Sequence, residues 1–78
     1  MKSRDVDGHK LREVRDELEL TGPEVIARIA EATGRTWSES LLYKVETGHR
    51  QPSSRFFGAV CRVYGREKDE FFKVKAAA

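Results

Sequence analysis

Several residue types and patterns are scarce in this chain, and each scarcity narrows what it can be. One cysteine among 78 residues excludes an internal disulfide, as is typical of proteins from a reducing compartment. No apolar run approaches the ~20 residues that a membrane-spanning helix needs. Residues 1–10 are too polar for a signal peptide. We therefore expect a soluble, cytoplasmic protein with no membrane partner.

Residues that catalyse reactions or hold metals are equally scarce. The two histidines, His9 and His49, are far apart in sequence, and Cys61 follows neither at a metal-ligand spacing. No grouping of a nucleophile with a histidine and an acid is found, and the glycines are too scattered to form a phosphate-cradling loop. We expect no enzyme activity, no metal, no cofactor and no small-molecule ligand.

The alternation of apolar and polar residues that indicates a β-strand is also missing. Charged residues make up 36% of the chain, which suits short helices with wet outer faces. The net charge is only +2, so attraction to a polyanion depends on where the basic residues lie. These features predict an all-α fold in a single domain over 1–78, with a folded core over about 8–73.

Start and stop signals place two helices in the first half of the chain. Asp7 is the expected N-cap of a helix over about 8–19. Its inner face carries Leu11, Val14 and Leu18. Thr21 and Glu24 form a capping box that opens a second helix, and Gly34 ends it. The inner face of the second helix carries Val25, Ile26, Ile29 and Ala30.

The stretch 36–53 carries the clearest local signals. Ser38 is a natural N-cap, Gly48 can take the left-handed conformation that ends a helix, and Pro52 forbids continuation. A short helix over about 38–47 is therefore predicted. Its apolar stripe is narrow and consists of Leu42 and Val45, with Leu41 on the flank. Such a helix suits a place half on a protein core and half in a groove.

Two further helices are expected after this stretch. Ser53 caps the fourth helix and Gly65 ends it. Its inner face carries Phe57, Val60, Cys61 and Tyr64. A fifth helix over about 67–73 returns Phe71 to the core and turns Phe72 outward. Five short helices around one core are the predicted architecture.

The segment V-E-T-G-H-R-Q-P-S at 45–53 resembles the I-E-x-G-x-R-x-P-S segment that closes the recognition helix of the lambda-repressor/Cro (XRE) family. The resemblance extends over roughly 11–72. It implies a five-helix, lambda-repressor-like helix-turn-helix domain that binds double-stranded DNA, with the helix over about 38–47 in the major groove. It also implies a transcriptional regulator, a repressor in our interpretation, that acts as a homodimer on a near-palindromic site.

The resemblance assigns roles to residues of this chain. It places base contacts on the helix over about 38–47, at Glu39, Ser40, Tyr43 and Lys44. It places phosphate contacts on the following loop, and we add the turn before the helix, which gives Thr47, His49, Arg50 and Arg35. It pairs an arginine late in the first helix with the glutamate of the V-E step, here Arg15 and Glu46. Lysine can donate to guanine and glutamate can accept from cytosine, so the base contacts are chemically reasonable.

Two departures from the family pattern concern the second helix. Gly22 and Pro23 stand where the family commonly has Ser/Thr-Gln, so the phosphate contact of that glutamine is missing. The interval from Thr21 to Glu46 is longer than usual, which predicts a longer second helix or turn within 30–36. The extension could bring Arg35 near the DNA backbone.

Three alternatives remain open from the sequence. Trp37 is expected to pack in the core or beside the Ser38 cap, and the alternative is that it stacks on a ligand. Phe72 and Val74 are expected at a homodimer interface, and the alternative is that Phe71 and Phe72 both fold inward. The rival function is a protein-interaction module, such as an antitoxin-like or phage or plasmid accessory factor.

Overall fold

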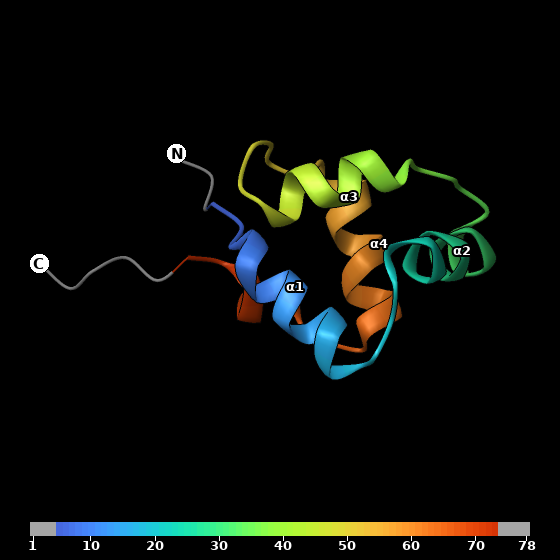
Figure 1. Cartoon of the computed structure of the whole chain (residues 1–78), viewed down its shortest axis with the longest axis horizontal. Helices are drawn as coiled ribbons and strands as arrows, with labels where there is room; N and C mark the ends of the chain where they lie inside the picture. Colours follow the sequence, from blue (N-terminus) through green and yellow to red (C-terminus); the bar gives the residue numbers. More distant parts are fainter. Residues whose placement is uncertain (1–4, 74–78) are drawn as a thin grey trace, which may run out of the picture.

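The computed structural model describes residues 5–73, which form four α-helices and one short 3-10 helix (Figure 1). These elements are α1 (Gly8–Glu17), α2 (Gly22–Thr33), α3 (Glu39–Glu46), α4 (Ser54–Tyr64) and the 3-10 helix η1 (Lys68–Phe71). No β-strand occurs within the described range, where an isolated bridge joins Val6 to Phe72. The predicted all-α class is confirmed, but the prediction of five α-helices is wrong.

The predicted N-caps form as expected. The Asp7 carboxylate accepts hydrogen bonds from the backbone N–H groups of residues 9 and 10, and Thr21 and Glu24 form the reciprocal capping box. The Ser38 and Ser53 hydroxyls each accept from a backbone N–H of the first turn of their helices. Local sequence therefore determines where all four α-helices begin.

The end of α1 differs from the prediction. The helix stops at Glu17, and Glu19 takes a left-handed conformation with φ of 56°. The N–H of Leu20 donates to the carbonyl of Arg15, which is the 6→1 hydrogen bond of a Schellman motif. This turn leaves Leu18 40% exposed and buries Leu20, which is 8% exposed. The helical spacing of Leu18 thus predicted its burial wrongly.

The segment expected to be a fifth α-helix is instead the four-residue 3-10 helix η1 followed by extended chain. The cause is pairing with the N-terminal segment. The Asp7 N–H donates to the Phe71 carbonyl at 2.6 Å, and the Lys73 N–H donates to the Asp5 carbonyl at 2.8 Å. Backbone groups used in this way cannot continue a helix.

The change in backbone alters the positions of the two neighbouring phenylalanines. Phe71 is fully buried, as predicted. Phe72 does not point outward as predicted: it is half-buried, and its ring lies 5.5 Å from that of Phe57 in an edge-on arrangement. Its backbone is extended, with φ −80° and ψ 140°, so the 100° helical step assumed for it does not apply. Val74 lies outside the described residues.

A single cluster of buried apolar side chains joins the elements. Within it, α2 packs on α4 and α3, α1 packs on α3, and η1 packs on α1 and α4. Cys61 is part of this cluster, and burial raises the pKa of its thiol to about 11. The thiol is therefore protonated at neutral pH and acts as a small apolar side chain. The cluster fixes α3 along one edge of the molecule (Figure 1).

Candidate nucleic-acid interface

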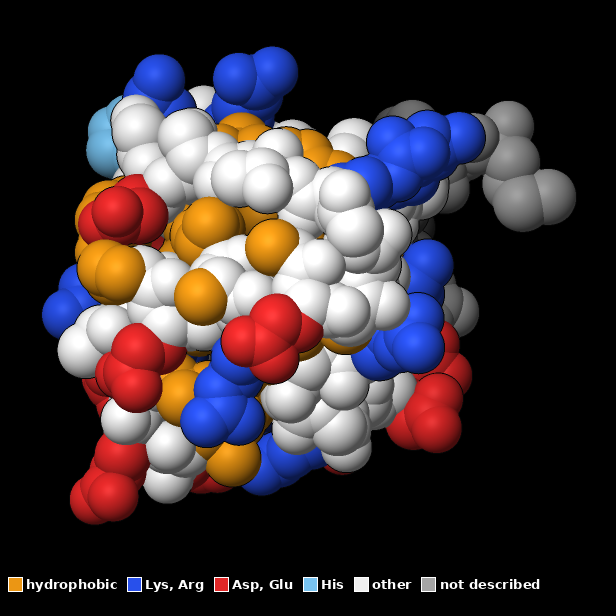
Figure 2. Space-filling model, turned by 90° about the vertical axis from the view of Figure 1, so that its right-hand side faces the viewer, with side chains coloured by type: hydrophobic (Ala, Val, Ile, Leu, Met, Phe, Trp, Pro, Cys, Tyr) orange, Lys and Arg blue, Asp and Glu red, His pale blue; other side chains and the backbone are white. Residues whose placement is uncertain are grey.

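One face of α3 is buried and the opposite face is exposed. Leu42, Val45 and Glu46 face the interior. The four residues predicted to contact bases are all exposed: Glu39, Ser40, Tyr43 and Lys44. Figure 2 shows Lys and Arg side chains at the upper edge of the molecule, which α3 forms in Figure 1, and others at the sides and lower part of the same face. The structure thus brings the predicted base-contacting residues together on one free surface.

The loop after α3 holds three of the predicted phosphate contacts in a compact arrangement. Thr47, His49 and Arg50 are exposed. The Thr47 hydroxyl donates to the Tyr43 carbonyl at 2.9 Å and lies 2.8 Å from Nδ1 of His49. The backbone N–H groups of His49 and Arg50 both donate to the Lys44 carbonyl. These hydrogen bonds therefore tie the loop to the last turn of α3.

The side chain of Gln51, for which the sequence pattern predicts no role, anchors the far end of this loop. The Gln51 amide oxygen accepts from the Val6 N–H at 2.9 Å, and the Gln51 amide nitrogen donates weakly to the Val6 carbonyl at 3.5 Å. The N-terminal segment thereby holds the loop against the body of the protein. Nothing in the spacing of the H-R-Q-P segment indicates this long-range contact, which only the fold creates.

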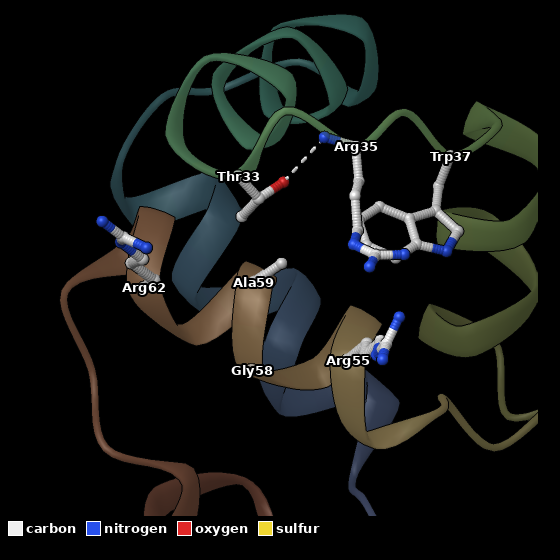
Figure 3. Close-up of a pocket in the computed structure, with 7 residues that line it drawn as sticks. All are labelled: Thr33, Arg35, Trp37, Arg55, Gly58, Ala59 and Arg62. Atoms are coloured by element: carbon white, nitrogen blue, oxygen red, sulfur yellow. Dashed lines mark hydrogen bonds between the residues drawn. The ribbon is translucent and has the colours of Figure 1, made fainter.

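The remaining predicted phosphate contact, Arg35, lies at the other end of α3. Its backbone N–H donates to the Thr33 hydroxyl at 3.1 Å, and its exposed side chain lies beside Trp37 (Figure 3). Arg35 therefore precedes α3, whereas Thr47 to Arg50 follow it. The eight residues of α3 between them span about 12 Å. Candidate cations thus flank the exposed helix face at both ends.

Tyr43 lies against the first turn of α2. A Cβ atom built on Gly22 would come within 2.2 Å of the Tyr43 hydroxyl, and within 3 Å of two of its ring carbons. Glycine at position 22 therefore makes room for the tyrosine ring where the resembled family carries a side chain. Gly22 replaces a residue that has a side chain in the family pattern, and the packing of Tyr43 explains this replacement. It holds Tyr43 between α2 and the free surface of α3.

Arg15 and Glu46 form a buried pair between α1 and the end of α3. Nε of Arg15 donates to one Glu46 carboxylate oxygen at 2.7 Å and the guanidinium Nη2 donates to the other at 3.0 Å. The remaining Nη1 donates to the Leu20 carbonyl at 3.0 Å. The hydrogen bond to Glu46 raises the pKa of Arg15 above its usual value. Glu46 is 2% exposed, so its negative charge is compensated inside the protein.

Tyr64 of α4 adds a polar atom to the same interior region. Its hydroxyl is buried and has no hydrogen-bond partner among residues 5–73. Burial raises the pKa of Tyr64, and the negative charge of Glu46 raises it further. The phenol is therefore neutral at neutral pH, and it contributes packing without charge.

Gly8 allows α1 to meet the end of α3 closely. A Cβ atom at position 8 would lie 1.9 Å from the Val45 carbonyl oxygen and 2.9 Å from that of Glu46. The positive N-terminal end of α1 thus abuts the carbonyls that end α3, an arrangement that the two helix dipoles favour. The sequence pattern places Gly8 in the first turn of the predicted helix but does not indicate this contact.

We expect Gly8→Ala to destabilise the domain by about 1–3 kcal/mol, the usual range for overpacking a close contact. The obstructing atoms are backbone, so α1 and α3 must separate to admit the methyl group. Urea unfolding followed by circular dichroism measures the loss. Gly58→Ala is the matched control, because a Cβ there has ordinary contacts of 3.6 Å or more. Equal stability of the two variants would contradict the close approach.

A family model described as a helix-turn-helix domain matches residues 8–71. The chain belongs to this helix-turn-helix family. No curated protein and no solved structure matches the chain. Domains of this family bind DNA in transcription regulators and are typically not enzymes. In this helix-turn-helix domain α2 and α3 follow one another in sequence and are joined by the turn over 34–38. No helix within residues 5–73 is long and apolar enough to cross a membrane.

Proposed function

We propose that this helix-turn-helix domain binds double-stranded DNA sequence-specifically as a transcriptional repressor of the lambda-repressor/Cro (XRE) type. The observation that carries the proposal is the exposed face of α3, where Glu39, Ser40, Tyr43 and Lys44 are all accessible. The opposite face of α3 is anchored in the core by Leu42 and Val45. An exposed polar helix face on a rigid support is what direct readout in the major groove requires.

The cations at the two ends of α3 fit the same mode of binding. Arg35 precedes α3, and His49 and Arg50 follow it, so the whole of this helix, about 12 Å long, lies between the two sets. The major groove of B-DNA is about 12 Å wide, so the two sets can approach phosphates on opposite sides of the groove. Neither arginine forms an ion pair within residues 5–73. They are therefore available to phosphate oxygens.

The buried pair supports this placement by removing a repulsion. Glu46 lies at the C-terminal end of α3, where an uncompensated carboxylate would repel the DNA backbone. Arg15 neutralises it through two hydrogen bonds. We propose that the pair is a positioning element: it contributes to DNA binding by fixing the end of α3 and by cancelling its charge.

DNA-binding measurements can distinguish the proposed base contacts from the proposed phosphate contacts. Lys44→Ala should cost about 1–3 kcal/mol on the preferred sequence and relax specificity at one position, because it removes a base contact. Arg50→Ala should weaken binding to all sequences alike and make the salt slope shallower by about one. The preferred sequence is first selected from a randomised DNA pool, and affinities are then measured by fluorescence anisotropy at several salt concentrations. Equal losses for Lys44→Ala on preferred and random duplexes would refute its role as a base reader.

We also propose a homodimer on a near-palindromic site, because two linked modules multiply the modest affinity of one. Sedimentation over a concentration series tests the assembly. We predict that Phe72, whose side chain is half-buried, contacts the second protomer. The contact predicted for Val74 lies outside the described residues. Comparison of wild type with Phe72→Ala tests that contact: an unchanged dimer would exclude it.

A protein-interaction module on the same scaffold is the second candidate. The acidic Glu39 on the exposed face of α3 and the net charge of only +2 favour it. Random duplex DNA separates the two functions. A DNA-binding regulator should bind it more weakly as salt rises, whereas absence of binding at low salt would support the interaction module.

A further inference from the structure

A pocket of about 280 Å³ lies between the end of α2, the turn before α3 and the side of α4 (Figure 3). Its lining residues are Thr33, Arg35, Trp37, Arg55, Gly58, Ala59 and Arg62. This volume is close to the lower end, about 300 Å³, of pockets that bind small molecules. The pocket lies off the exposed face of α3 that we propose reads DNA bases, and it shares only Arg35 with the proposed DNA contacts, so that function leaves Trp37 and Arg55 unexplained.

The charge of the pocket is of one sign. Three arginines line it and no carboxylate does. Three arginines elsewhere in the described chain, Arg12, Arg15 and Arg66, form ion pairs, whereas Arg28 and Arg50 form none. Within residues 5–73, no ion pair or side-chain hydrogen bond involves the guanidinium of Arg35, Arg55 or Arg62. The pocket therefore presents unpaired donors suited to an oxyanion.

The arginines are arranged around an aromatic ring. In Figure 3 the side chains of Arg35 and Arg55 point toward the space beside Trp37, and Arg62 lies at the far end of the pocket and points away. The Trp37 indole is half-buried and held edge-on against Phe56, with ring centroids 5.4 Å apart. This contact fixes the ring and leaves part of it accessible. A fixed indole beside two guanidiniums can stack a flat ring and bind its charge together.

The other lining residues offer a ligand no free hydrogen-bonding side chain. Gly58 has no side chain and Ala59 presents only a methyl group, so neither offers a polar group to a ligand, and the end of the Lys68 side chain lies 3.6–3.7 Å from where a Cβ of Gly58 would stand. The Thr33 hydroxyl donates to the Ile29 carbonyl and accepts from the Arg35 N–H. Thr33 therefore positions the backbone of Arg35 and is not available as a further donor. Recognition must come from the indole and the guanidiniums.

We propose that this pocket binds a small planar anion of the nucleoside monophosphate class, with the ring against Trp37 and the phosphate between Arg35 and Arg55. A phosphate monoester carries a charge of about −1.5 to −2 at neutral pH, which two guanidiniums match. Bidentate hydrogen bonding from arginine suits its three oxygens. The sequence predicted no small-molecule ligand, because the residues that form the pocket come from α2, the turn and α4 and meet only in the fold.

The proposal can be tested directly, because Trp37 is the only tryptophan of the chain. Its fluorescence reports on the pocket without a label. Adenosine 5′-monophosphate is titrated into the full chain at physiological salt, with excitation at the red edge of the tryptophan band. We expect a saturable fluorescence change, with adenosine and inorganic phosphate each binding at least about tenfold more weakly, since each lacks one half of the recognition.

Variants separate specific binding from general attraction of charge. Arg55→Gln and Arg35→Gln should each weaken binding of adenosine 5′-monophosphate by about tenfold or more, the effect of losing one charge-assisted contact. Arg12→Gln removes the same charge from the exposed side of α1 and should leave the affinity unchanged. Circular dichroism confirms that each variant is folded. The proposal is overturned if no saturable change occurs up to millimolar ligand, or if Arg12→Gln weakens binding as much as Arg55→Gln.

A further experiment with duplex DNA asks whether the phosphate bound in the pocket belongs to a free nucleotide or to the DNA backbone. A random-sequence duplex is added to the protein saturated with adenosine 5′-monophosphate. Retention of the nucleotide on the protein–DNA complex supports a separate ligand site. Competitive displacement would show that the pocket takes backbone phosphate and would overturn the proposal. Failure of DNA binding as such leaves the fluorescence result intact, so the two functions are tested separately.

Discussion

Arg15→Ala should lower the free energy of unfolding by about 3–5 kcal/mol, the range for breaking a buried ion pair from one side. The substitution removes all three hydrogen bonds of the guanidinium, including the two to the 2%-exposed Glu46. The carboxylate then remains buried without a partner, which is the dominant penalty. Urea unfolding at neutral pH measures the change, and the loss is large against the whole stability of a small domain.

Two comparisons make this result specific. Arg12→Ala removes an exposed arginine from the same helix, paired to Asp16 only at 4.0 Å, and should cost no more than about 1 kcal/mol. The double variant Arg15→Met with Glu46→Leu should recover most of the loss, because apolar pairs often replace buried ion pairs without destabilisation. If Arg15→Ala behaves like Arg12→Ala, the buried pair does not hold α1 to α3. DNA affinity in the same variants then tests whether Arg15 and Glu46 are coupled in binding as well.

Phe71→Ala should destabilise the domain by about 3–5 kcal/mol, as truncation of a buried phenylalanine commonly does. The Phe71 ring is fully buried and lies 6.2 Å from that of Phe57 in an edge-on arrangement. Its removal leaves a cavity beneath η1, at the point where the N-terminal segment is hydrogen-bonded to the chain. Thermal and urea unfolding of the variant measure the loss.

Phe72→Ala is the matched control for this prediction. Phe72 neighbours Phe71 in sequence and contacts the same Phe57 ring, but it is only half-buried. We expect a smaller loss, because the area of apolar surface that returns to water is smaller. A loss for Phe72→Ala equal to that for Phe71→Ala would contradict the assignment of Phe71 as the core residue that closes the fold.

The sequence predicted those parts of the fold that depend on neighbouring residues. Ser38 and Ser53 cap their helices through bonds to groups three residues away, and Gly34, Gly48 and Gly65 all take positive φ. Such signals act within one turn of chain, so they can be found without knowledge of the fold. Periodicity likewise located the buried faces of α2, α3 and α4.

The features that the sequence did not predict depend on contacts between distant segments. The left-handed turn at Glu19 moved burial from Leu18 to Leu20, although glutamate carries no turn signal. The conformation of 68–73 depends on hydrogen bonds to Asp5 and Asp7 at the other end of the chain. For these residues, tertiary pairing outweighs the local helical preference.

The candidate site divides in the same way. The exposure of Glu39, Ser40 and Lys44 followed from the spacing of the apolar residues in the predicted helix. The packing of Tyr43 over Gly22 could not be predicted, because it requires the angle between α2 and α3. The pocket beside Trp37 was equally out of reach, since its arginines are separated by up to a third of the chain.

The backbone pairing between residues 5–7 and 71–73 places the two ends of the described chain side by side (Figure 1). A domain whose two ends lie close together can be inserted into a surface loop of a host protein without forcing the two sides of that loop apart. Such an insertion would leave the exposed surface of α3 unobstructed, so the DNA binding proposed for that surface would be transferred to the host protein.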